Sequence, residues 1–93
     1  MRKYELMTVF TVDEESYNAG IESLRKTLDG FGVKVVSEDS RGDRNLTYEI
    51  KKQSKGRYVL FIIESETDKI SELTRQLKLI PAILTFMFVR IES

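Results

Sequence analysis

Cysteine and histidine are both absent from the 93 residues, and proline occurs once. Without cysteine the chain has no disulfide, no thiolate ligand for a metal ion and no cysteine nucleophile. Without histidine it lacks the usual proton carrier near neutral pH and the partner of a Ser-His pair. These two absences remove the chemistry of most hydrolases and metalloenzymes, so an enzyme is the least favoured class.

Long apolar runs are missing as well. No window approaches the roughly 20 apolar residues that cross a bilayer, and the N-terminus opens directly into patterned sequence without the apolar run of a signal peptide. We therefore expect a cytoplasmic protein. Hydrophobic residues make up 41% and charged residues 32%, which is typical of a packed globular chain, and we expect one domain spanning 1–93.

An excess of charge of either sign is also lacking, since 15 Lys and Arg residues balance 15 Asp and Glu residues. The charges are nevertheless unevenly distributed. Between residues 41 and 57 two acids accompany six cations, which are Arg41, Arg44, Lys51, Lys52, Lys55 and Arg57. This segment of charge +4 can attract a polyanion whatever the total charge, because cations close to phosphates release condensed counterions.

The first half of the chain predicts a strand followed by an amphipathic helix. Residues 4–12 are rich in β-branched and aromatic types, with Tyr4, Leu6, Thr8 and Phe10 on one face. Asp13 is suited to cap a helix, and two glutamates follow it, where the helix dipole favours carboxylates. Apolar residues then recur at steps of four, three and four, and Gly30 and Gly32 suit a left-handed C-terminal stop.

The second half predicts a long hairpin, a second helix and a last strand. A strand from 33 to 50 contains Gly42, a residue type suited to a bulge, a loop follows from Lys51 to Gly56, and 57–64 reads as a central apolar strand. Ser65 or Thr67 is expected to cap the second helix. That helix must end before Pro81, and residues 83–91 form the last strand.

The order strand, helix, strand, strand, helix, strand predicts an α+β fold. It is the ferredoxin-like split βαββαβ arrangement, a four-stranded antiparallel sheet with two helices on one face. The other face would be available to a partner. Periodicity predicts a core that includes Phe10, Leu24, Leu28, Ile70, Leu73 and Leu77.

Several segments together resemble the bacterial small-subunit ribosomal protein six family. They are the opening Met1–Glu5, the hairpin segment Arg44–Lys51, the loop exit Gly56–Tyr58 and the closing Phe86–Arg90. The resemblance spans essentially the whole chain. The chain departs from the family pattern at Asn45, Glu49 and Thr85, where a basic residue, proline and arginine are usual.

The resemblance implies a non-catalytic ribosomal component without a cofactor or metal ion. Members of this family join small-subunit ribosomal RNA in the platform together with small-subunit ribosomal protein eighteen. The partner is itself basic, which would help a member of zero net charge to stay on RNA. The resemblance therefore implies an RNA-binding structural protein.

Nine residues are candidates for RNA contact: Arg2, Lys3, Tyr4, Arg44, Tyr48, Lys51, Lys52, Lys55 and Arg57. The cations could bind phosphates, and the two tyrosines could stack on bases. Among the hairpin cations the arginines come first, because a planar guanidinium engages phosphate with two hydrogen bonds. The competing interpretation is a solvated surface that keeps an edge strand soluble, with Tyr4 packed on the core.

Two other classes remain open on the residues alone. A regulatory or small-molecule-binding module of the same fold would dimerise through its open sheet face. An acylphosphatase-like enzyme would need a phosphate loop after the first strand, but Thr11–Glu15 is acidic where an anion should sit. Electrostatics therefore opposes the enzyme.

Overall fold

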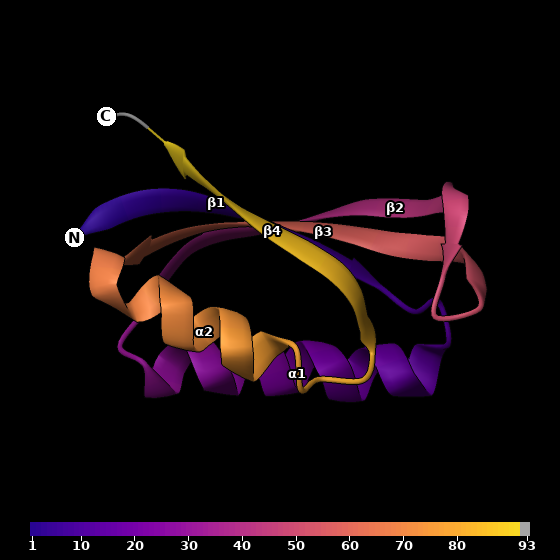
Figure 1. Cartoon of the computed structure of the whole chain (residues 1–93), viewed down its shortest axis with the longest axis horizontal. Coiled ribbons are helices and arrows are strands. Elements are labelled where there is room, and N and C mark those ends of the chain that lie inside the picture. Colours follow the sequence, from indigo (N-terminus) through magenta and orange to yellow (C-terminus); the bar gives the residue numbers. More distant parts are fainter. Residues whose placement is uncertain (92–93) are drawn as a thin grey trace.

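The computed structural model describes residues 1–91, which contain four strands, two α-helices and one short 3₁₀ helix. In chain order they are β1 (Arg2–Phe10), α1 (Glu14–Gly30), β2 (Lys34–Ile50), β3 (Gln53–Ser65), η1 (Thr67–Lys69), α2 (Ile70–Leu77) and β4 (Ile83–Ile91). The antiparallel sheet has the order β2-β3-β1-β4, and both helices cover one of its faces (Figure 1). The predicted split βαββαβ fold is confirmed.

The first strand and helix follow the sequence pattern closely. β1 begins and ends two residues before the predicted bounds. The Asp13 side chain caps α1 by accepting a hydrogen bond from the backbone N–H of Ser16 at 3.0 Å. Gly32, with φ +70°, provides the left-handed stop, whereas Gly30 is still helical. No helix within residues 1–91 is both long and apolar enough to cross a membrane.

The hairpin between β2 and β3 differs from the prediction. The register shifts between Ser40 and Gly42, and Gly42 has φ +85°, so the predicted bulge is confirmed. The predicted loop Lys51–Gly56 is wrong, because only Lys51 and Lys52 form the turn, and β3 begins at Gln53. Both lysines have positive φ, 51° and 65°, as a tight two-residue hairpin turn requires.

The start of the second helix also differs from the prediction. Neither Ser65 nor Thr67 caps it: the 3₁₀ helix η1 comes first, with Glu66 at its start and no side-chain cap. The Ser65 hydroxyl instead donates to the carbonyl of Glu66 at 3.0 Å. α2 ends at Leu77, four residues before Pro81, as the proline predicted.

The core lies between the sheet and the two helices. Phe10, Leu24, Leu28, Leu73 and Leu77 are fully buried, as predicted, while Ile70 is only partly buried. Thr8 is also fully buried on β1, and its hydroxyl donates to the carbonyl of Val59 on β3 at 2.8 Å. A hydroxyl in the core is tolerated there because its hydrogen bond is satisfied.

Gly56 lies where β3 passes close to the end of β1, and we expect Gly56→Ala to destabilise the protein. A Cβ at this position would overlap Cγ1 of Val9 and lie 3.2 Å from Cδ2 of Leu46. Val9 is buried and β-branched, so it cannot swing aside. Overpacking of this kind costs about 1–3 kcal/mol.

Urea unfolding measures this loss, with Gly30→Ala as the matched control. A Cβ at Gly30 meets nothing within 4 Å, and its φ is not positive, so alanine there should not destabilise α1. Equal unfolding midpoints for Gly56→Ala and the wild type would contradict the close packing described for Gly56.

Candidate nucleic-acid interface

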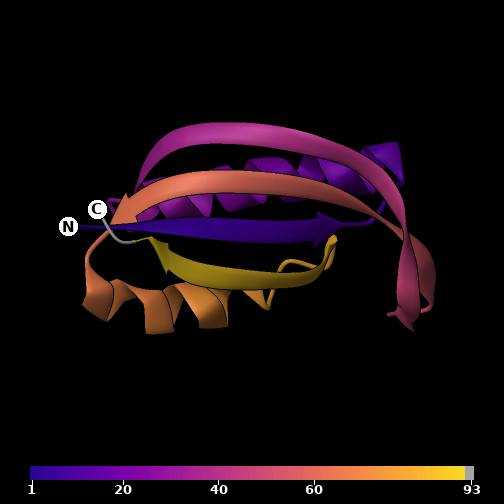
Figure 2. The same ribbon diagram turned by 90° about the horizontal axis from the view of Figure 1, so that it is seen from above.

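The predicted RNA-binding residues lie at two ends of the sheet. Arg2 and Lys3 are at the start of β1, whereas the hairpin cations lie beyond the other end of that strand, where Phe10 pairs with Arg57. Figures 1 and 2 show the N-terminus and the hairpin tip at opposite ends of the molecule, whose longest extent is 36 Å. The candidates therefore form two surfaces.

The larger surface is the part of β2 and β3 that projects past β1, residues 44–56, which we call the hairpin arm. In Figure 2 the arm bends toward the side of the sheet where β4 and α2 lie. The ammonium group of Lys51 at its turn donates to the carbonyl of Ile83, at the start of β4, at 3.0 Å. Lys51 thus anchors the tip of the arm to the body of the protein.

Three other candidate cations are exposed along this surface: Arg44, Lys52 and Lys55. The guanidinium carbon of Arg44 lies 5.4 Å from the centre of the Tyr58 ring, within reach of a cation–π interaction. Tyr48 is 80% exposed, so nearly all of its ring is accessible to a base. The arm therefore combines exposed cations with an exposed aromatic ring, which is the combination that single-stranded RNA binders use.

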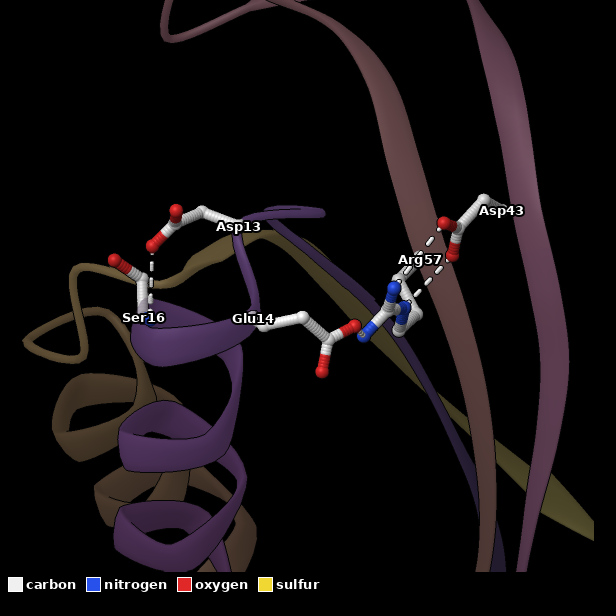
Figure 3. Close-up of polar contacts among 5 residues, drawn as sticks. All are labelled: Asp13, Glu14, Ser16, Asp43 and Arg57. Carbon is white, nitrogen blue, oxygen red and sulfur yellow. Dashed lines mark hydrogen bonds and ion pairs between the residues drawn. The ribbon is translucent and has the colours of Figure 1, made fainter.

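Arg57 is placed quite differently from these cations (Figure 3). Its Nε and Nη2 atoms donate to the two oxygens of Asp43, at 2.7 and 3.2 Å, and its Nη1 lies 2.8 Å from an oxygen of Glu14. The guanidinium also lies 4.6 Å from the centre of the Tyr17 ring. Only 17% of the side chain is exposed, so its hydrogen-bonding capacity is taken up inside the protein.

The charge network around Arg57 shows in the pKa values of two of its members. The hydrogen bonds from Arg57 lower the pKa of the Asp43 carboxyl below its usual range. Asp43 first, and then Glu14, raise the pKa of the Arg57 guanidinium. Arg57 and Asp43 are therefore both charged at neutral pH. Contact between Arg57 and RNA stays a prediction, and it would require a phosphate to displace one of the two carboxylates.

Two of the acidic residues at the start of α1, Asp13 and Glu14, have structural partners. Asp13 accepts the hydrogen bond of the helix cap, which lowers the pKa of its carboxyl, and Glu14 pairs with Arg57 (Figure 3). No group of three or more acidic, cysteine or histidine side chains is placed to hold a metal ion within the described part of the chain. Asp13 and Glu14 therefore act in capping and ion pairing.

Tyr4 packs in the core. It is 6% exposed, and its ring meets Phe88 edge to face, with 6.4 Å between the ring centres and 81° between the planes. Little ring area is left for a base, so the structure favours the packing interpretation for the chain alone. An RNA contact by Tyr4 stays a prediction.

The smaller surface contains two cations that the sequence analysis did not select. In the strand register, Lys3 of β1 and Lys34 of β2 both lie opposite Glu64 of β3, one on each side of it. Arg90 of β4 lies opposite Tyr4 of β1. Like Arg2 and Lys3, both are exposed. Lys34 and Arg90 are far from residues 2–3 in the sequence, so only the sheet register could have indicated that they lie at the same end.

The geometry of the turn leads to a prediction for Lys52. Its φ of 65° is unfavourable for a residue with a Cβ, and glycine adopts it freely. Lys52→Gly should therefore raise the free energy of unfolding by about 0.5–1 kcal/mol. Lys55→Gly makes the same charge change at a strand position and should lower stability instead. Urea unfolding of both variants measures these changes in stability. A lower midpoint for Lys52→Gly than for the wild type would contradict the left-handed conformation of Lys52 in the turn.

Comparison with known proteins agrees with this structure. The family model described as Ribosomal protein S6 matches residues 3–90. Small ribosomal subunit protein bS6 of Treponema denticola is 55% identical over 93 residues, which cover all of both chains. The protein of the same name from Treponema pallidum is 42% identical over the same length.

A solved structure extends the likeness to the fold. The crystal structure of 30S ribosomal protein S6 from Thermotoga maritima superposes with a TM-score of 0.85 at 25% sequence identity, covering 97% of this chain and 87% of that one. Sequence and fold thus lead to one family. The chain belongs to the ribosomal protein S6 family of the small ribosomal subunit, and its location is the cytoplasmic ribosome.

Proposed function

We propose that residues 1–93 act as one domain that binds small-subunit ribosomal RNA in the platform, together with small-subunit ribosomal protein eighteen. The chain would be a structural constituent of the subunit and would catalyse no reaction. The observation that carries this proposal is the hairpin arm, which presents exposed cations beside an exposed tyrosine at one end of the sheet.

The arm suits RNA because its charges are available. Arg44, Lys52 and Lys55 form no ion pair with a carboxylate within residues 1–91. Exposed cations of this kind can neutralise phosphates and release their counterions. Tyr48 can stack on an unpaired base, which every base permits because each has a π face.

The second cationic surface, at the start of β1, would give RNA a second point of attachment. Arg2, Lys3, Lys34 and Arg90 are exposed at that end. Two separated points of contact would fix the orientation of the protein on folded RNA. Phosphate contacts determine position and orientation and do not read the base sequence. An RNA of defined shape, as in a ribosomal subunit, could span both.

The exposed apolar side chains on the helix-free face of the sheet are consistent with binding of a protein partner. Its side chains alternate with those of the core, and Met87 and Val89 on β4 are 59% and 41% exposed. Apolar side chains exposed close together on one face commonly mark a protein-binding surface. RNA and the partner would thus use different parts of the molecule.

The test is a binding titration of the protein with a platform fragment of small-subunit ribosomal RNA across a salt series. The titration is run with and without small-subunit ribosomal protein eighteen. We expect tight binding only with the partner, and weaker binding as salt rises, because phosphate contacts release counterions. Binding that ignores salt, or no binding with the partner present, would count against the proposal.

The same apolar face could instead join two copies of this chain, as a regulatory module of this fold would. Sedimentation of the isolated protein distinguishes the two, since the proposal predicts a monomer that gains mass only with its partner. The acylphosphatase-like alternative is opposed by the loop after β1. An anion there would meet Glu14 and Asp43, which already surround Arg57.

A further inference from the structure

We propose that Arg57 sets the direction of the hairpin arm by tying it to α1 through Glu14. It would thus be a positioning residue for RNA binding rather than a phosphate contact. This inference rests on the proposed function for its RNA-binding part. The tie between the arm and the helix can be tested without RNA.

The position of Arg57 in the sheet is that of a pivot. On one side it pairs with Phe10, the last residue of β1, and on the other side with Asp43 of β2. Every residue of β3 before it lacks a partner on β1, so the arm begins at this point. A contact made here controls how the arm leaves the sheet.

The partners of Arg57 connect three elements. Asp43 lies on β2 and Glu14 in the first turn of α1, while Arg57 itself is on β3 (Figure 3). The Tyr17 ring of α1 lies against the same guanidinium. The guanidinium group is planar and its N–H groups point in fixed directions. When it bonds both carboxylates, its orientation relative to α1 is therefore fixed.

Apart from Arg57, a few local contacts hold the arm, and no buried strand face does. Every residue of β2 is exposed except Leu46 and Ile50, which are partly buried, so this strand has no buried face. A two-stranded hairpin without a packed face is marginally stable in water. Within residues 1–91, other contacts that join the arm to the body are the close packing of Gly56 against Val9, the cation–π contact of Arg44 with Tyr58 and the hydrogen bond from Lys51 to Ile83 at the tip.

If the region acts only through its charge, removing one of its acids should strengthen RNA binding. Glu14→Gln makes the protein more positive and frees Nη1 of Arg57 for phosphate, while Asp43 keeps the other two nitrogen atoms, so RNA should bind more tightly. If Arg57 positions the arm, the same change releases the arm from α1 and RNA should bind more weakly. The sign of one substitution therefore separates the two roles.

The experiment compares Glu14→Gln with Glu15→Gln in the complex with the partner protein and platform RNA. Glu15 lies in the same first turn, is exposed and forms no ion pair within residues 1–91, so its change alters charge alone. We expect about tenfold weaker binding for Glu14→Gln, with an unchanged dependence on salt, and no loss for Glu15→Gln. Tighter or equal binding for Glu14→Gln would overturn the proposal.

The salt dependence of Arg57→Gln gives a second reading. Removal of a phosphate contact lowers the slope of log K against log salt by about 0.7–0.9, whereas removal of a positioning residue leaves the slope unchanged. We expect weaker binding with the wild-type slope. A slope lowered by one contact would make Arg57 an RNA ligand.

Amide hydrogen exchange of the free protein separates this inference from the proposed function. In Glu14→Gln the amides of residues 44–56 should exchange faster than in the wild type, while Glu15→Gln should leave them unchanged. This result would support the tie even if the wild-type complex failed to bind RNA, which would defeat the proposed function alone. Equal exchange in all three proteins would disprove the tie.

Discussion

Changing Arg44, Lys52 and Lys55 together to glutamine is expected to weaken binding to platform RNA by about 100-fold and to lower the salt slope by about 2–3. These three side chains are exposed cations of the hairpin arm, and none of them forms an ion pair with a carboxylate within residues 1–91. Each cation that is removed leaves one phosphate without its neutralising partner, so fewer counterions are released when the protein binds. The three changes in slope therefore add. A titration across a salt series, with the partner protein present, measures both quantities.

The matched control removes three cations from the helical side. Lys26, Arg75 and Lys78 are exposed on or directly after the helices, away from the helix-free face of the sheet. Changing them to glutamine alters the total charge by the same amount. We expect binding close to that of the wild type, and an equal decrease in both triple variants would mean that total charge, and not the arm, governs the affinity.

Phe10→Ala is expected to cost about 3–5 kcal/mol of the free energy of unfolding, because a fully buried phenyl ring leaves a cavity when it is removed. Phe10 has no exposed surface and packs edge to face on Tyr17, with 5.3 Å between ring centres. It also ends β1 at the base of the arm, opposite Arg57. This loss approaches the whole stability of a small protein.

Urea unfolding of Phe10→Ala and Met87→Ala tests this expectation. Met87 is 59% exposed on the helix-free face, so its truncation should change stability by no more than about 0.5 kcal/mol. Similar losses for the two variants would show that the core does not lie where the structure places it.

The sequence predicted the fold well because local patterns determine most of its elements. The alternation in β1, the cap at Asp13 and the stop at Gly32 each act within a few residues, and each was confirmed. The predicted hairpin loop was too long. Lys51 and Lys52 form a two-residue turn with positive φ at both positions, and such turns are usually recognised in a sequence by asparagine and glycine. β3 extends back to Gln53 because it pairs with β2 in an exposed arm, where no apolar pattern is needed.

The candidate site was less predictable, because it depends on contacts between distant residues. Local charge clustering indicated the arm, but it could not show that Glu14 neutralises Arg57 from another element. It also could not separate Arg2 and Lys3, at one end of the sheet, from the arm at the other. Lys34 and Arg90 join the first group only through the register of the strands.

The most direct test of the central claim is a comparison of lysine acetylation rates in the free protein and in its assembled complex with RNA and the partner protein. All lysines are measured in one experiment by mass spectrometry. If the arm binds RNA, Lys52 and Lys55 will be strongly protected in the complex, while Lys26 and Lys78 on the helical side will react at their free rates. Protection of the helical lysines, with Lys52 and Lys55 as reactive as in the free protein, would contradict it.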